Sequence, residues 1–483
     1  MKKHLAVDIG ASSGRHILGS IQDGRIVLEE VYRFDNKQVH KNGHDCWDMD
    51  NLWNGIVEGL KACSRIGKIP KTIGIDTWAV DYVLLDGDDR MIGDAVAYRD
   101  ARTEGMDQYV DAVISPARLY EKTGIQKQLF NTIYQLTAQK QESPEQLFAA
   151  ASLLMIPDYL NFLLTGNKKQ EYTNATSTNL INASKKTWDL DLIRRLGFPE
   201  KLFGELSMPG TVVGHLLPEI QEMTGFNATV ILPATHDTGS AFLAVPAQDD
   251  DAVYLSSGTW SLLGVENMSP VTSEASRRQN FTNEGGAWYR FRYLKNIMGL
   301  WMIQSIRREL NGVAYVEGRT SKYADGRTWS FPDLITAAKG AQDFTSIVDV
   351  NDESFLAPES MIDAVKAYCE RTRQQIPQTV GEIMQCVYLG LAACYKEAIR
   401  SLSQLTGKTY TSINIVGGGC QDMYLNQLTA DAANLPVYAG PVEGTAIGNL
   451  IVQFIAAGEF DSLQTARDAI RDSFDIKIIQ AKQ

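Results

Sequence analysis

The 483-residue chain contains little cysteine, little histidine and no excess of basic residues. Its six cysteines include no C-x-x-C pair, so they predict neither a disulfide framework nor a cysteine-built zinc site. The six histidines are scattered without metal-ligand spacing, which argues against a histidine-built metal site. The formal net charge of −12 argues against a nucleic-acid-binding protein, because such proteins present a basic surface.

Long apolar runs are also missing. No stretch reaches the roughly 18 residues that a membrane span needs. The N-terminal apolar run breaks at Asp8, which does not fit a signal peptide. We therefore expect a cytoplasmic protein with no membrane partner. The chain is too long for one ordinary core, so its length predicts two domains.

Strand and helix patterns alternate along the chain and predict an α/β fold. Residues 4–35 predict three strands joined by Gly-containing turns, and residues 51–66 predict a helix. Residues 103–165 are expected to be largely helical. The polar segment PAQDDDA at 246–252 lacks periodicity and is the best candidate for a domain boundary.

Two segments share one pattern. AVDIGASSGRHIL at 6–18 and VYLSSGTWSLLGV at 253–265 each combine an apolar strand, a tight Gly/Ser turn and a second apolar strand. The repetition suggests two copies of one α/β unit. Small residues in such turns let backbone N–H groups approach a phosphate. Asp8 ends the first strand, where an apolar residue is expected, and a carboxylate there can hold Mg²⁺ through its water shell.

Two segments match known motifs, but the surrounding sequence lacks what each motif requires. GASSG at 10–14 matches the nucleophile elbow of serine hydrolases, but the elbow needs a helix next, and a strand is predicted here. TGKT at 406–409 resembles the end of a Walker A motif, yet Leu402 stands where that motif needs glycine. Neither segment therefore indicates its motif's chemistry.

Three further segments leave alternatives open. In PATHDTGSAF, Asp237 either caps the following helix or performs chemistry at a strand end. In GIDTWAVDY, Asp76 and Asp81 flank Trp78, which is either part of a sugar-binding wall or a core residue. Three successive glycines at 417–419 exceed what a turn needs and would let a nucleotide lie against bare backbone.

Together these segments resemble the FGGY carbohydrate kinases of the actin-like, hexokinase-like ATPase superfamily. The resemblance covers nearly the whole chain and is closest to the members that act on L-rhamnulose. It is carried, in order, by VDIGASSGR, GIDTWAVD, AYRDART, EYTNATST, THDT, YLSSGTWSL, NEGG, LKNIMGLW and GGGCQ. It implies two actin-like (ribonuclease H-like) α/β domains facing each other across a cleft. Residues 1–247 would hold the sugar site, the first phosphate loop and the catalytic base, and residues 248–483 the second phosphate loop and the adenosine site.

The resemblance also implies roles for single residues. Asp237 matches the proton acceptor, and Asp8 would hold Mg²⁺ through water. The positions that match sugar contacts are Ala79, His236, Asp237, Thr238 and Asn296. The positions that match ATP contacts are Ala11, Ser12, Ser13, Gly14, Arg15, Thr259, Gln304 and Gly418. Ala79 stands where glycine is usual, and its methyl group would narrow the sugar pocket slightly.

The implied activity is ATP- and Mg²⁺-dependent phosphorylation of L-rhamnulose to L-rhamnulose 1-phosphate in L-rhamnose catabolism, by a monomer or weak dimer. A kinase for another ketose, such as L-fuculose or L-xylulose, and a non-enzymatic actin-like ATP-binding protein are the alternatives. Separately, Pro377 should interrupt a helix between Cys369 and Cys386. Two helices folded back there would bring the thiols close, with disulfide formation left open.

Overall fold

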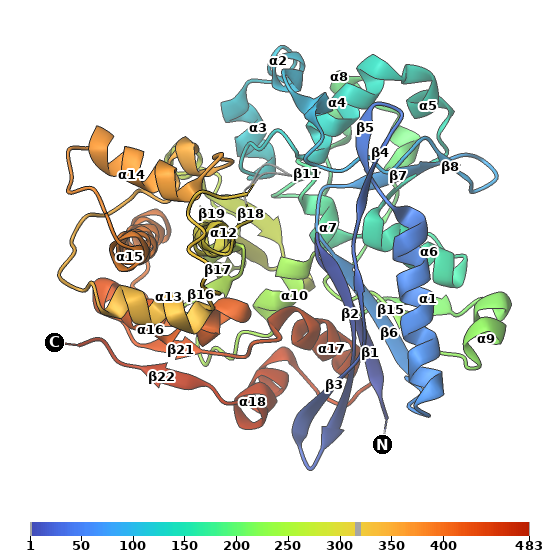
Figure 1. Ribbon diagram of the computed structural model, residues 1–483. Helices are drawn as coiled ribbons and strands as arrows, with labels where there is room; N and C mark the ends of the chain where they lie inside the picture. The colour runs from blue at the N-terminus through green and yellow to red at the C-terminus, as the bar shows by residue number, and fades with distance from the viewer. Residues whose placement is uncertain (1, 314–319, 483) are drawn as a thin grey trace. The chain divides into compact units, whose positions relative to one another are not determined.

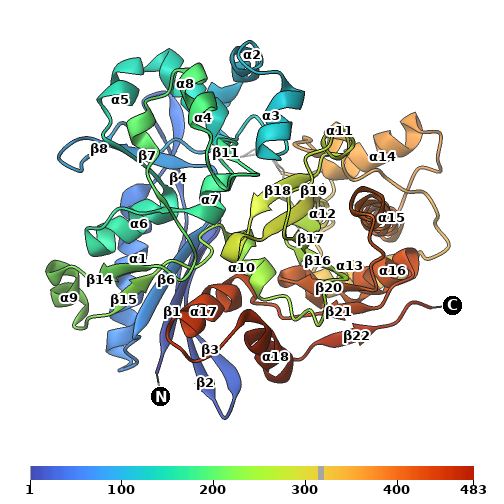
Figure 2. The same ribbon diagram turned by 180° about the vertical axis from the view of Figure 1, so that it is seen from behind.

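A computed structural model describes residues 2–313 and 320–482. Contacts between residues divide the chain into two compact units, whose elements Figures 1 and 2 label. Unit 1 comprises Met1–Pro246, Glu266–Leu294 and Glu443–Phe474, and unit 2 comprises Ala247–Val265, Lys295–Val442 and Asp475–Gln483. Spatial grouping thus places two later segments with the N-terminal half. The division of the chain into a domain of residues 1–247 and a domain of residues 248–483 stays a prediction.

Unit 1 is built on a six-stranded sheet of order β14-β15-β6-β1-β2-β3. The pairs β1–β2 and β2–β3 are antiparallel hairpins, whereas β1–β6 and β6–β15 are parallel. The strands are β1 (His4–Ile9), β2 (Ser13–Gln22), β3 (Arg25–Asp35), β6 (Thr72–Thr77), β14 (Val212–His215) and β15 (Thr229–Ile231). The three strands predicted within residues 4–35 are therefore confirmed.

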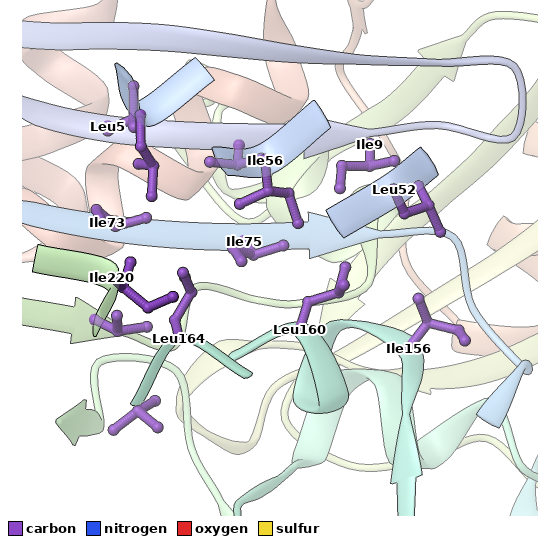
Figure 3. Close-up of a cluster of buried hydrophobic side chains, with 14 of the residues drawn as sticks. Leu5, Ile9, Leu52, Ile56, Ile73, Ile75, Ile156, Leu160, Leu164 and Ile220 are labelled. Atoms are coloured by element: carbon purple, nitrogen blue, oxygen red, sulfur yellow. The ribbon is translucent and has the colours of Figure 1, made fainter. Parts of the chain in front are cut away.

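Helices cover both faces of this sheet, and every residue of β1 is therefore buried. Leu5 and Ile9 point to one face, where they pack with side chains of α1 (Met49–Arg65) and α6 (Ile156–Thr165), as Figure 3 shows. Ala6 points to the other face and packs against α17 (Gly444–Ala456). Asp8 has the same strand parity as Ala6, so its carboxylate faces the α17 side.

Shorter elements complete unit 1. An antiparallel three-stranded sheet, β8-β7-β9, is accompanied by several helices. These elements are β7 (Tyr82–Leu85), β8 (Met91–Ile92), β9 (Ser152–Met155), α2 (Met106–Asp111), α3 (Pro116–Thr123), α4 (Thr132–Glu142), α5 (Pro144–Ala149), α7 (Tyr172–Thr176) and α8 (Leu190–Leu196). Further elements of unit 1 include β4 (Gln38–Lys41), β5 (His44–Trp47), α9 (Pro218–Thr224), α10 (Asp237–Leu243), α11 (Glu274–Arg278), β18 (Thr282–Gly285) and α18 (Leu463–Ser473). Residues 103–165 are largely helical as predicted, and α6 ends at Gly166 with a left-handed φ of 71°.

Unit 2 repeats the same strand arrangement. Its strands β17, β16, β20 and β21 follow one another in the sheet, with an antiparallel hairpin first and parallel neighbours next. The strands are β16 (Ala252–Ser257), β17 (Trp260–Asn267), β20 (Ser412–Val416), β21 (Val437–Ala439) and β22 (Lys477–Ile479). The order β17-β16-β20-β21 matches β2-β1-β6-β15 of unit 1, so the two similar sequence segments do begin two similar units.

Helices of unit 2 include the predicted interrupted pair. They are α12 (Trp301–Leu310), α13 (Phe331–Lys339), α14 (Met361–Arg371), α15 (Val380–Thr406) and α16 (Met423–Ala433). The Sγ atoms of Cys369 on α14 and Cys386 on α15 lie 3.7 Å apart, and both thiols are buried and free. The predicted proximity of the two thiols is therefore confirmed. Among the helices of the described residues, none combines the length and apolar character that crossing a membrane requires.

Candidate functional site

The Gly/Ser turn between β1 and β2 has an exposed tip, and hydrogen bonds from Asn36 stabilise it. Ala11 and Ser12 are exposed. Asn36 donates from Nδ2 to the carbonyl of Gly10 at 3.0 Å and from its backbone N–H to the carbonyl of Ser12 at 3.0 Å. A Cβ on Gly14 would lie 2.3 Å from the Phe34 ring, so glycine is required for the strand to pack there. The turn is thus held in place while its small residues stay accessible.

Arg15 lies between two carboxylates of unit 1. Its Nη2 donates to Asp8 Oδ2 at 2.6 Å, and its Nη1 contacts Glu443, which caps α17. Burial raises the pKa of Asp8, and the charge of Arg15 opposes that rise. The guanidinium therefore holds the Asp8 carboxylate at the end of β1, and α17 contributes to the same ion-pair group.

Asp76 lies beside Asp8 because β1 and β6 run parallel with these residues in register. Asn449 of α17 donates from Nδ2 to Asp76 Oδ2 at 2.5 Å. A Cβ on Gly74 would lie 2.5 Å from the Asn449 amide oxygen, so that glycine makes room for the contact. Burial first, and then the charge of Asp8, raises the pKa of Asp76 well above its usual value. Its Oδ1 is buried without a hydrogen-bond partner in the described part of the chain.

Asp237 is the first residue of α10, not its cap. The N-cap is His236, which has extended φ and ψ and makes no side-chain capping bond. Asp237 Oδ1 instead accepts from the backbone N–H of Thr238 at 2.5 Å and from its hydroxyl at 3.0 Å. The side chain is 32% exposed, and burial, followed by the charge of Asp8, raises its pKa to about 6. A carboxylate with a pKa near neutrality that still reaches solvent is suited to accept a proton.

Close packing of two helices fixes the place of Asp237. A Cβ on Gly448 of α17 would lie 1.7 Å from the carbonyl oxygen of Ser240 on α10. Any larger residue would push the helices apart. The N-terminus of α10 is also tied to β6, because Thr77 donates its backbone N–H to the carbonyl of Thr235 at 2.9 Å.

His236 has two partners that the sequence reasoning did not assign. Arg292 on β19 (Phe291–Met298) donates from Nη2 to His236 Nδ1 at 3.0 Å. Glu284 on β18 pairs with Arg292 Nη1 at 2.9 Å. Glu284 is part of the NEGG segment noted above, so the sequence did contain a signal for it. Arg292 gave no signal that distinguishes it from Lys295, the other cation of the same strand.

Glu171 was also missed. This fully buried carboxylate caps α7 by accepting from the backbone N–H groups of Thr173 and Asn174, at 2.8 and 3.1 Å. Its Oε2 also accepts from the Thr235 hydroxyl at 2.7 Å. Glu171 therefore fixes the residue that precedes His236. Burial raises the pKa of Glu171 despite these donors.

Ala79 lies half-buried in a tight turn between β6 and β7. Asp81 donates its backbone N–H to the Ala79 carbonyl at 3.0 Å, across Val80. Val80 has a φ of 69°, which is strained for a β-branched residue. Ser177 accepts from its N–H at 3.1 Å, and the Thr132 hydroxyl donates to its carbonyl at 2.6 Å. Strain held by such bonds is typical of functional sites.

Trp78 belongs to the core, which was one of the two alternatives for this residue. It is 6% exposed and packs on Trp47 with ring centroids 4.0 Å apart. Asp81 accepts from the indole N–H groups of both tryptophans, at 2.6 and 2.9 Å, and from Gln135 at 2.9 Å. Burial raises the pKa of Asp81 to about 6. These bonds orient the tryptophans.

In unit 2, Thr259 and Gln304 lie together at the turn between β16 and β17. The Thr259 hydroxyl donates to Gln304 Oε1 at 3.4 Å. The helix α12 begins against this turn, since the N–H of Trp301 donates to the Thr259 carbonyl at 3.1 Å. A Cβ on Gly299 would lie 2.6 Å from the backbone nitrogen of Ser261, so the close approach needs glycine.

Glycine occupies each of the three positions after β20 for a different structural reason. Gly417 has a left-handed φ of 84°. A Cβ on Gly419 would lie 1.9 Å from the hydroxyl oxygen of Ser257, so that glycine packs against the end of β16. Gly418 is exposed, and a Cβ there would meet no atom within 4 Å. Its own conformation and packing therefore do not demand glycine, and a ligand in contact with the backbone would explain it.

The predicted site residues are divided between the two units. Unit 1 holds the metal and base candidates and most of the sugar contacts, listed as Asp8, Ala11–Arg15, Ala79 and His236–Thr238. Unit 2 holds Thr259, Asn296, Gln304 and Gly418, with Asn296 half-buried on β19. Within residues 2–313 and 320–482, no cluster of three or more His, Cys, Asp or Glu side chains is arranged to hold a metal. The hard oxygen donors of Asp8 and the unpartnered Oδ1 of Asp76 fit Mg²⁺ held through water rather than enclosed by the protein.

Comparisons with known proteins show the family of this chain. The N-terminal domain of the FGGY family of carbohydrate kinases matches residues 4–244, and the C-terminal domain matches residues 253–457. A rhamnulokinase of Oceanobacillus iheyensis is 51% identical over 473 residues, which cover 98% of this chain and 97% of that protein. A rhamnulokinase of Halalkalibacterium halodurans is also 51% identical, over 99% of this chain and 98% of its own length.

Solved structures share the fold at low sequence identity. A gluconate kinase from Lactobacillus acidophilus has a TM-score of 0.80 at 19% identity and covers 100% of this chain and 94% of its own. A ligand-bound xylulose kinase from the same organism has a TM-score of 0.79 at 18% identity, with the same coverage. The fold is therefore the two-domain α/β fold of sugar kinases, and the chain belongs to the FGGY family of carbohydrate kinases.

Proposed function

We propose that this chain transfers the γ-phosphoryl group of ATP to L-rhamnulose, giving L-rhamnulose 1-phosphate and ADP, as a step of L-rhamnose catabolism. The observation that carries the reaction class is Asp237, a partly exposed carboxylate whose pKa is raised to about 6 at the start of α10. The choice of sugar rests on two relatives named rhamnulokinase that are 51% identical over almost the whole chain.

Asp237 acts as the general base in this proposal. Its carboxylate accepts the proton of the sugar hydroxyl as the hydroxyl oxygen bonds to the γ-phosphorus and the bond to the β,γ-bridging oxygen breaks, which releases ADP. Such phosphoryl transfers depend mostly on positioning and charge neutralisation. A positioned base typically adds about 10²–10⁴-fold to the rate. His236, Thr238, Ala79 and Asn296 would orient the sugar.

The proposed ATP contacts come from turns with accessible backbone. Ala11 to Arg15 of the β1–β2 turn would contact phosphate oxygens, and Thr259 would do so from the matching turn of unit 2. Gln304 would contact the nucleotide, and the exposed Gly418 would let it lie against bare backbone. Asp8 would hold Mg²⁺ through water. When bound, Mg²⁺ neutralises charge on the phosphoryl oxygens.

Two alternatives predict different behaviour. An FGGY kinase for L-fuculose or L-xylulose would turn over those ketoses faster than L-rhamnulose. A non-enzymatic actin-like protein would bind ATP without ketose-dependent turnover, and it would have no use for a base such as Asp237. The proposed location is the cytoplasm, a reducing compartment, which fits six cysteines that are all free thiols.

The test is a coupled assay of ADP release with purified protein, ATP and Mg²⁺. We expect turnover to require a ketose and kcat/KM to be highest for L-rhamnulose among the three sugars. Equal ADP release with and without ketose would contradict a sugar kinase. A higher kcat/KM for L-fuculose or L-xylulose would contradict the substrate and leave the reaction class intact.

A further inference from the structure

Among residues 2–313 and 320–482, Arg292 is the largest of the fully buried side chains, with no exposed surface. A buried guanidinium is costly unless each of its donors finds a partner. Here Nε donates to the carbonyl of Gly285 at 3.0 Å, Nη1 pairs with Glu284 at 2.9 Å, and Nη2 reaches His236 Nδ1 at 3.0 Å. The contact with His236 is therefore one of two hydrogen bonds that, together with the ion pair to Glu284, hold the guanidinium in place.

The contact decides which nitrogen of His236 carries the proton. A guanidinium has only donors, so the nitrogen that it touches must offer a lone pair. Nδ1 is then unprotonated, and a neutral imidazole must carry its proton on Nε2. The competing tautomer would place an N–H on Nδ1 toward Glu284, but that oxygen is 3.5 Å away, while the donor of Arg292 is at 3.0 Å. Burial and the charge of Arg292 also lower the pKa of His236 well below its usual value, which favours the neutral ring.

The other ring nitrogen of His236 lies on the side of the base. Nε2 is 3.6 Å from Asp237 Oδ1. That oxygen already accepts two hydrogen bonds from Thr238. We propose that Arg292 is a positioning residue that holds His236 as the Nε2–H tautomer, so that the ring donates to the oxygen of the sugar hydroxyl and Asp237 is left as the acceptor of its proton. This inference rests on the proposed function.

The tautomer matters because the opposite one would place a lone pair beside Asp237. A sugar hydroxyl between the two side chains could then give its proton to either of them. With Nε2 protonated, the hydroxyl has one acceptor, and a hydrogen bond to its oxygen fixes the direction of its own O–H bond. Glu284 contributes by neutralising Arg292, which keeps the guanidinium charged and in place.

The direct test reads the tautomer without any sugar. The full-length protein is labelled with ¹⁵N-histidine, and long-range ¹H–¹⁵N correlation spectra distinguish protonated from unprotonated ring nitrogens. His236→Gln identifies the His236 signals among the six histidines of the chain. We expect an unprotonated Nδ1 and a protonated Nε2. A proton on Nδ1 would overturn the inference.

Two variants of nearly equal length test what the N–H does. In His236→Gln the amide oxygen can accept from Arg292 while the amide N–H donates forward, and His236→Met can do neither. We expect His236→Gln to keep at least about tenfold more kcat/KM for the sugar than His236→Met, since a lost oriented hydrogen bond costs on the order of tenfold. KM for ATP should be the same in both. Equal losses in the two variants would overturn the inference.

Arg292→Lys tests the positioning residue itself. Lysine keeps the charge that pairs with Glu284, but its single ammonium nitrogen lacks the planar fork that lets Arg292 donate to Gly285 and His236 together. We expect the protonated fraction of His236 Nε2 to fall and kcat/KM for the sugar to drop about tenfold, with KM for ATP unchanged. An unchanged tautomer with unchanged kcat/KM would overturn the inference. If Arg292→Lys does not fold, the spectrum of the wild type and the comparison of His236→Gln with His236→Met still test the inference.

The control is His40→Gln, which changes an exposed histidine on β4 and should alter neither the His236 signals nor the kinetics. The inference and the proposed function can fail separately. Protein that does not phosphorylate L-rhamnulose contradicts the function, whereas the spectrum of His236 is read on the sugar-free protein.

Discussion

Asp237→Asn removes the proposed base with little change in shape. The amide oxygen can still accept from the N–H and hydroxyl of Thr238, which bond the carboxylate in the structure. The protein should therefore fold and bind ATP normally. Because the amide cannot take up a proton at neutral pH, kcat should fall by at least about 10².

The structure also sets the pH at which the wild-type enzyme should lose activity. The carboxylate is the active form, so activity is present above its pKa and is lost as the pH falls through that value. Burial raises the pKa of Asp237 from 3.8 to about 6. At pH 5 about a tenth of Asp237 would be ionised, so kcat/KM should be about a tenth of its plateau. An unshifted aspartate would remain mostly ionised at that pH.

The assay is the rate of ADP release from pH 4.5 to 8 for the wild type, Asp237→Asn and a control. Asp23→Asn is a matched control, because Asp23 is exposed in the β2–β3 turn with a φ of 49°, which asparagine also adopts. The wild type and the control should share an acid limb with a midpoint near pH 6, and Asp237→Asn should lack it. Near-normal turnover of Asp237→Asn, or a wild-type midpoint near pH 4, would refute the assignment of Asp237 as the base.

Three further predictions concern other parts of the chain. Gly418→Ala should leave the melting temperature unchanged and raise KM for ATP. Gly419→Ala should destabilise unit 2 by about 1–3 kcal/mol, because the added Cβ has no room. Equal melting temperatures of the two variants would contradict this difference. Asp8→Ala should raise the Mg²⁺ concentration needed for half-maximal activity while sugar binding without ATP survives, and an unaltered Mg²⁺ requirement would make Asp8 a structural residue. Mild oxidation should crosslink Cys369 to Cys386, whose sulfurs lie 3.7 Å apart, and peptide mapping that finds only freely alkylated thiols would contradict this.

Much of the fold could be predicted because its signals are local. Apolar runs separated by Gly-containing turns in residues 4–35 predict the first three strands, because such turns mark the ends of short strands. Gly166 predicts the end of α6 because glycine adopts a left-handed conformation without steric cost. The Gly/Ser turns at the ends of β1 and β16 revealed the two similar units because each turn of small residues lies between two apolar strands in the sequence.

The candidate site could be predicted only in part. Asp237 and His236 were recognisable because they interrupt an apolar segment between a strand and a helix. The residue that caps α10 was less predictable. Aspartate is a favoured N-cap residue, but in the structure the N-cap is His236, which has an extended backbone, and Asp237 is the first residue of the helix. The sequence also could not distinguish the three glycines after β20, because Gly417 and Gly419 pack against Ser257, which lies far away in the chain, and Gly418 does not.

The sequence by itself determined the order of strands and helices, the Gly/Ser turns and the identity of the proposed base, since each of these depends on residues close together in the chain. Only the tertiary structure decided which distant side chains contact His236 and Asp76. Arg292 reaches His236 across 56 residues, and Asn449 reaches Asp76 across 373. Such contacts arise when strands and helices pack, because a buried charged or polar group is stabilised by a partner wherever in the chain that partner lies.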